Sequence, residues 1–163
     1  MSTFERDEYK WRETYFVLFD AAKRPSLQQV EAMLKDLNDR FELLNPVADE
    51  DGRFESLTIM SPDDYAALDI SFEAGDEVRE QGASFYQELK PSVSDADERK
   101  RLARLPKCDG RFDLLHFEHM TPAVAESDDE DEMLDPSALL IVLDALVELV
   151  DGVGVDPASG TLL

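Results

Sequence analysis

The stretch YFVLFDAAKRPSLQQVEAMLKDL, residues 15–37, joins a predicted strand to a predicted helix and indicates mixed α and β structure. Its first part, Tyr15–Phe19, is entirely apolar, as expected of a strand that is covered on both faces. Ser26 and Gln29 have the spacing of a capping box, which marks the start of a helix. The apolar residues that follow at helical spacing are Leu27, Val30, Met33, Leu34 and Leu37.

The residues after this helix predict a hairpin. Phe41–Leu44 and Phe54–Met60 have strand-like composition and are separated by a turn that contains Asp51 and Gly52. An Asp-Gly pair tolerates the positive φ that tight turns require, so the two segments are expected to pair. Further along, alternation predicts a strand at residues 68–72, and helical spacing predicts helices at residues 76–90 and 94–105.

A similar order of elements returns in residues 112–163. Phe112–Phe117 predicts another buried strand. Asp135 and Pro136 are residue types preferred at the N-cap and the first position of a helix, so they predict the start of the last helix. Gly152 is expected to end that helix in the left-handed conformation, and residues 153–163 then predict a closing hairpin.

The last helix is expected to be buried around most of its circumference. Its polar residues fall on one narrow stripe, and almost all of its other residues are Leu, Ile, Val or Ala. The residues of this polar stripe are Ser137, Asp144, Glu148 and Asp151.

These elements together predict an α+β fold, with a mainly antiparallel sheet and helices packed on one face. Ferredoxin-like βαβ units fit the order of elements, and the two similar halves suggest a pseudo-repeat. We expect residues 1–163 to form a single domain, with halves at about 11–90 and 108–163 and an acidic loop at 126–132.

Charge is the most informative feature of the composition. The chain has 163 residues, with 38 Asp and Glu against 16 Lys and Arg, and a formal net charge of −22. Such a surface disfavours direct binding to nucleic acids and anionic membranes, since both require basic residues. The N-terminus lacks the apolar region of a signal peptide, and the longest apolar stretch, residues 138–150, is too short to span a bilayer. We therefore expect a cytoplasmic protein.

The charges are also unevenly distributed. Residues 121–163 contain 11 acidic residues and no Lys or Arg, whereas residues 99–111 are rich in Lys and Arg. Three interpretations remain open. The acidic loop is solvated and keeps the protein soluble, or the basic segment folds against it, or the acidic surface binds a basic partner protein.

Residues with catalytic chemistry are few. His116, Glu118 and His119 are the candidates for a transition-metal site, in a metal-dependent enzyme or a hydrolase. On a strand, however, positions 116 and 119 point to opposite faces. Cys108 lies in no recognisable nucleophile motif, and the sequence contains no phosphate-binding glycine motif. No cofactor is expected.

The leading hypothesis is a non-enzymatic protein that binds a basic protein partner, as an inhibitor, an immunity-like protein or an adaptor. Trp11 and Tyr86 are aromatic residues in charged surroundings and are the candidate anchors of the interface. A metal-dependent enzyme and a small-ligand sensing module, with a pocket between sheet and helices, remain alternatives. The acidic residues expected to steer the partner are Asp128, Asp129, Glu130 and Asp131.

Overall fold

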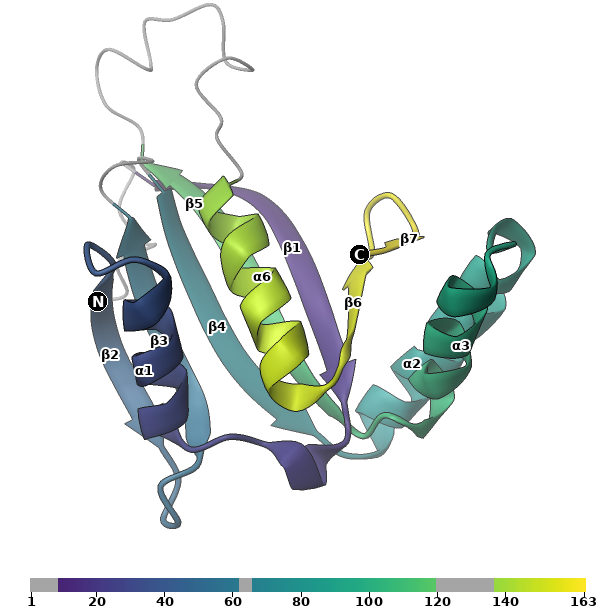
Figure 1. Ribbon diagram of the computed structural model, residues 1–163, viewed down its shortest axis with the longest axis horizontal. Coiled ribbons are helices and arrows are strands. Elements are labelled where there is room, and N and C mark those ends of the chain that lie inside the picture. Colours follow the sequence, from purple (N-terminus) through teal and green to yellow (C-terminus); the bar gives the residue numbers. More distant parts are fainter. Residues whose placement is uncertain (1–8, 62–65, 120–136) are drawn as a thin grey trace, which may run out of the picture.

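The computed structural model describes residues 9–61, 66–119 and 137–163, and shows one sheet flanked by helices (Figure 1). Within these residues the sheet has seven strands in the order β2-β3-β4-β5-β1-β6-β7, and all neighbouring strands are antiparallel. The strands are β1 (Tyr9–Phe19), β2 (Glu42–Ala48), β3 (Phe54–Ser61), β4 (Ala66–Ala74), β5 (Gly110–His119), β6 (Val153–Asp156) and β7 (Thr161–Leu162). The α-helices are α1 (Leu27–Leu37), α2 (Asp76–Leu89), α3 (Ala96–Arg104) and α6 (Ser137–Val150). The predicted α+β class and antiparallel sheet are therefore confirmed.

Local hydrogen bonds explain why α1 begins where the sequence predicts. The Ser26 hydroxyl accepts a hydrogen bond from the Gln29 backbone N–H at 3.1 Å, and the Gln29 side chain accepts one from the Ser26 N–H at 2.9 Å. This capping box satisfies two of the N–H groups that a helix start leaves without partners. The helix then buries Val30 and Leu34 against the sheet.

The β2–β3 hairpin also forms at the predicted turn. Gly52 has a φ of 79°, a conformation that glycine adopts without strain. Asp49 closes the turn, because its Oδ1 accepts hydrogen bonds from the backbone N–H groups of Asp51 and Arg53, both at 2.9 Å. Charged residues at such a tip stay in water, while the strands that follow enter the core.

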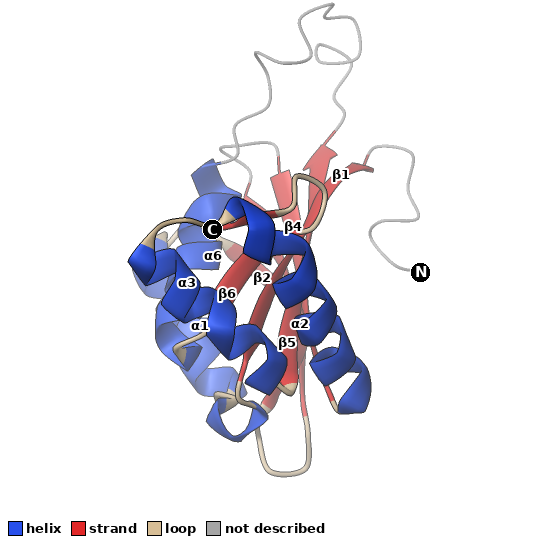
Figure 2. Cartoon of the chain, turned by 90° about the vertical axis from the view of Figure 1, so that its right-hand side faces the viewer, coloured by secondary structure: helices blue, strands red, loops and turns tan. Residues whose placement is uncertain are grey.

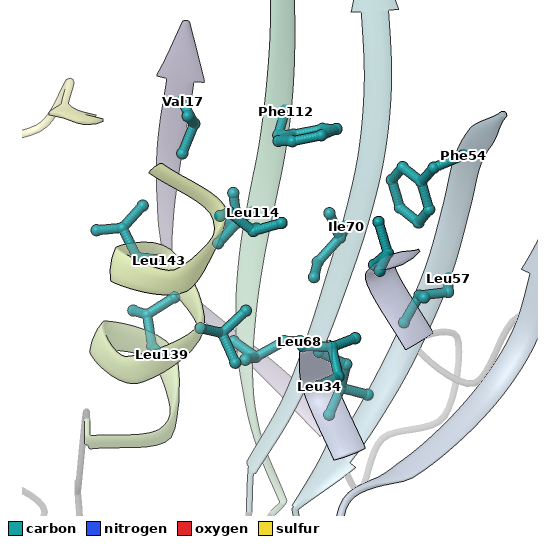
Figure 3. Packing of buried hydrophobic residues seen from close by; sticks show 14 of the residues in the cluster. Val17, Leu34, Phe54, Leu57, Leu68, Ile70, Phe112, Leu114, Leu139 and Leu143 are labelled. Carbon is teal, nitrogen blue, oxygen red and sulfur yellow. The ribbon is translucent and has the colours of Figure 1, made fainter. Parts of the chain in front are cut away.

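Helices α1 and α6 cover one face of the sheet and enclose the first hydrophobic core (Figure 3). Aromatic rings pack closely at its centre. The ring centroids of Phe19 and Phe112 are 4.7 Å apart, and Phe54 meets Phe112 edge-on at 5.6 Å. Alternate residues of β4 and β5, including Leu68 and Leu114, complete this core.

Helices α2 and α3 pack on the opposite face, over β1 and β6, as Figure 2 shows. The prediction that all helices lie on one face is therefore wrong. The reason lies in the continuous apolar run of β1, which supplies side chains to both faces. Val17 and Phe19 belong to the first core, whereas Leu18 packs with Val78 and Leu105 in the second.

The ferredoxin-like units and the pseudo-repeat are not confirmed. The order strand, helix, strand, strand does occur twice, as β1–α1–β2–β3 and β5–α6–β6–β7. However, the helical connections in the two halves span different numbers of strands. Helix α6 connects β5 to β6 across one intervening strand, while α1 connects β1 to β2 across three. The two halves therefore share an order of elements but not an arrangement.

The end of α6 differs from its prediction. The left-handed residue is Asp151, with a φ of 51°, and not Gly152. Gly152 is required for another reason, since a Cβ atom there would lie 2.8 Å from the Leu18 carbonyl oxygen and 2.9 Å from Cγ1 of Val17. The glycine thus allows the chain to pass close to β1 as it leaves the helix.

Candidate partner-binding surface

Helix α6 carries an exposed stripe that combines apolar and acidic residues. Leu140 and Ile141 are 41% and 47% exposed, and Asp144 and Glu148 are exposed on the same stripe. The spacing of three and four residues places all four on one side of a helix. We call these four residues the α6 stripe. The opposite side of the helix is buried in the first core through Leu139, Val142, Leu143, Leu146 and Val150.

This stripe corrects the prediction that the last helix is buried everywhere except along one narrow stripe of polar residues. Asp144 and Glu148 are exposed as predicted, but Leu140 and Ile141 lie beside them and not in the core. A single exposed apolar residue is ordinary on a protein surface. Two adjacent ones on a stripe whose other members are carboxylates form a more specific surface.

The carboxylates of the stripe have no cationic partner among the described residues. Asp144 and Glu148 make no ion pair with any residue in the described part of the chain. Residues 137–163 contain no Lys or Arg at all, so no cation of this segment competes for them. The stripe therefore presents negative charge together with apolar area.

The basic segment neutralises the far end of α6. Asp151 lies 3.3 Å from Nζ of Lys23 and 3.6 Å from a terminal nitrogen of Arg104. Arg104 also donates to the backbone carbonyl of Asp151, and Arg101 donates to the terminal carbonyl of Leu163 at 2.6 Å. Cations are favourable at this position because the C-terminal end of a helix carries partial negative charge. The interpretation that the basic segment folds against the acidic loop 126–132 stays a prediction, because that loop lies outside the described residues.

The predicted steering residues, 128–131, lie outside the described residues. Trp11 belongs to β1, where its backbone pairs with Phe117 of β5, and its side chain is likewise outside the description. Tyr86 is half-buried on α2 and contacts the second core. Because α2 and α6 lie on opposite faces of the sheet (Figure 2), Tyr86 and the α6 stripe do not form one surface.

The histidine cluster is a buried polar network at one end of the sheet. His116 is 2% exposed, and its Nδ1 lies 3.3 Å from Oε1 of Glu13, which is on the neighbouring strand. Tyr15 donates to the other Glu13 oxygen at 3.1 Å. Burial and the nearby Glu13 carboxylate raise the pKa of Tyr15 to about 12. Glu118, 4% exposed, is two residues further along the strand of His116.

Glu13 is the member of this network that sequence reasoning missed. It lies 103 residues from His116 in the chain, and only the pairing of β1 with β5 brings the two together. His119 occupies the last position of β5, opposite Tyr9, and its side chain is not described. Within the described residues, no group of three or more His, Cys, Asp or Glu side chains is placed to hold a metal ion.

Cys108 is a buried thiol. It is 5% exposed, and its Sγ contacts the Arg104 carbonyl oxygen at 3.3 Å. Burial raises its pKa to about 11, so the reactive thiolate is scarce at neutral pH.

No protein-family model, curated protein or solved structure matches this chain. None of the helices within the described residues combines the length and the apolar character that a membrane crossing requires. Function must therefore be inferred from the surfaces of the chain itself.

Proposed function

We propose that this protein is a non-enzymatic binding protein, which uses the α6 stripe and the acidic residues 126–132 to bind a basic protein partner. The observation that carries the proposal is the exposure of Leu140 and Ile141 beside Asp144 and Glu148. An inhibitor, an immunity-like protein and an adaptor would all use such a surface.

The stripe combines apolar and charged residues, as protein interfaces in general do. Interfaces place apolar residues at a desolvated centre and charged residues at a solvated rim. Leu140 and Ile141 supply the centre, and Asp144 and Glu148 supply a negative rim. A positively charged partner surface with an apolar centre would complement both.

The two kinds of residue contribute differently to binding. Full burial of a Leu or Ile side chain is worth about 1.5–3 kcal/mol, so covering the exposed two-fifths to one-half contributes about 1 kcal/mol per residue. The carboxylates act mainly on the association rate, because a charged surface steers an oppositely charged partner at long range. Residues 126–132 are also negatively charged, and they precede α6 in the chain.

The test is the capture of partner proteins from native cell extract at low salt. Immobilised wild-type protein is compared with a Leu140→Gln and Ile141→Gln double variant. The matched control is Val47→Gln, which changes a side chain that is 43% exposed on the edge strand β2. Glutamine is a good helix former, and the two α6 positions are exposed, so the double variant should fold normally.

We expect one basic protein that wild type and Val47→Gln retain at least tenfold more than the double variant does. Raising the salt concentration should release it, because screening weakens the charged rim. Equal retention by the double variant and wild type would refute the proposal, and so would captured proteins without a basic member.

A further inference from the structure

A second surface feature lies between α2 and α3, which run side by side in both views (Figures 1 and 2). There the two helices enclose a pocket of about 330 Å³, which is within the range of small-molecule sites. The residues that line it are Tyr86, Lys90, Arg99, Leu102 and Ala103.

The pocket is lined by two cations, Lys90 and Arg99. Lys90 and Arg99 make no ion pair with any residue that the structure describes. Lys90 and Arg99 are exposed, whereas the half-buried Arg111 pairs with Asp113. Two cations that face one pocket without a carboxylate of their own leave positive charge for a ligand.

Each cation makes one contact with the residues around the pocket. Nζ of Lys90 lies 5.5 Å from the centroid of the Tyr86 ring, within the range of a cation–π contact. Nε of Arg99 donates to the Val93 carbonyl oxygen at 3.3 Å. This bond uses only one of the five guanidinium N–H groups, so the terminal nitrogens remain able to bind an oxyanion.

The remaining lining is apolar. Leu102 is 2% exposed and forms part of the second core, and Ala103 lies next to it on α3. The Tyr86 ring adds an aromatic surface. A ligand that fits therefore has a flat apolar body and a single oxyanion group.

We propose that the α2–α3 pocket binds a small aromatic oxyanion, with a carboxylate or phosphate group between Lys90 and Arg99 and its ring against Tyr86 and Leu102. This site is separate from the α6 stripe, because the two lie on opposite faces of the sheet. Either site can fail its test without affecting the other.

The experiment is isothermal titration of the full chain with four probes in 0.15 M salt. This ionic strength screens long-range repulsion from the other carboxylates, since the Debye length is then about 8 Å. Benzoate and phenyl phosphate test the two oxyanions, benzamide lacks the charge, and inorganic phosphate lacks the ring. The variants are Lys90→Gln and Arg99→Gln. The matched control is Lys100→Gln, an exposed cation next to Arg99 that does not line the pocket.

We expect benzoate, phenyl phosphate or both to bind, and benzamide and inorganic phosphate to bind at least tenfold more weakly. Which aryl anion binds identifies the oxyanion. Lys90→Gln and Arg99→Gln should each weaken binding about tenfold, or about 1.4 kcal/mol, and Lys100→Gln less than twofold. The Leu140→Gln and Ile141→Gln variant should bind the probes as wild type does. The inference is overturned if neither aryl anion binds, if inorganic phosphate binds equally well, or if Lys100→Gln weakens binding as much as Arg99→Gln.

Discussion

Replacing Gly82 with alanine tests the packing of α2 more sharply than any other single change. Gly82 is buried in α2, where the helix contacts a short 3-10 helix, η5 (Leu105–Lys107). A Cβ atom at this position would lie 2.2 Å from the Leu105 carbonyl oxygen and 3.0 Å from its carbonyl carbon. Both are backbone atoms of a fully buried residue, so no side chain can rotate away to make room.

Two effects of opposite sign compete in Gly82→Ala. Helix propensity alone would stabilise the variant by about 1 kcal/mol. Inserting a methyl group into a packed core typically costs about 1–3 kcal/mol, and contact with backbone atoms belongs at the upper end. The net expectation is a loss of about 2 kcal/mol in the free energy of unfolding. For a chain of this length, that corresponds to a melting temperature lower by about 4–8 °C.

Urea denaturation followed by circular dichroism measures this loss. The control is Ala83→Gly at the next, exposed position of α2, which should lose about 1 kcal/mol through helix propensity alone. A Gly82→Ala protein as stable as wild type, or more stable, would show that α2 and η5 do not pack as described.

Three further results are expected. Converting residues 128–131 to amides should slow association with the captured basic partner about tenfold at low salt and leave the melting temperature nearly unchanged, measured by surface plasmon resonance and calorimetry; unchanged association, or a collapsed fold, would contradict this. Burial raises the pKa of Asp69 in the folded state above its value in the unfolded chain. The folded state therefore loses stability as the pH rises from the pKa of Asp69 in the unfolded chain to its pKa in the folded chain. Asp69→Asn should therefore unfold at higher urea concentration than wild type at pH 7, with a difference that shrinks below about pH 4. Because the pKa of Cys108 is about 11, iodoacetamide at pH 7.5 should label the folded chain at least about 100-fold more slowly than the urea-unfolded chain, and equal rates would contradict its burial.

The sequence predicted those elements whose cause is local. The capping box of Ser26 and Gln29 depends on residues three apart, and the turn at Gly52 depends on a single backbone conformation. Strand β4 followed from simple alternation of apolar and polar residues. In each case the deciding interactions lie within one turn or one strand.

Features that depend on distant residues could not be predicted in this way. The apolar run of β1 indicates a strand covered on both faces but not which helix covers each one, so the placement of α2 and α3 was missed. The exposure of Leu140 and Ile141 depends on how α6 is rotated against the sheet. Glu13 meets His116 only because β1 pairs with β5.

Site-specific photo-crosslinking to the captured partner tests the proposed surface most directly. A crosslinker is attached to Ile141→Cys and, as the control, to Val47→Cys, while the native Cys108 stays unlabelled because it is buried. We predict that the partner crosslinks to the label at position 141 and not to the label at position 47. If position 141 gives no crosslink, or both positions crosslink equally, the α6 stripe is not the surface that binds the partner.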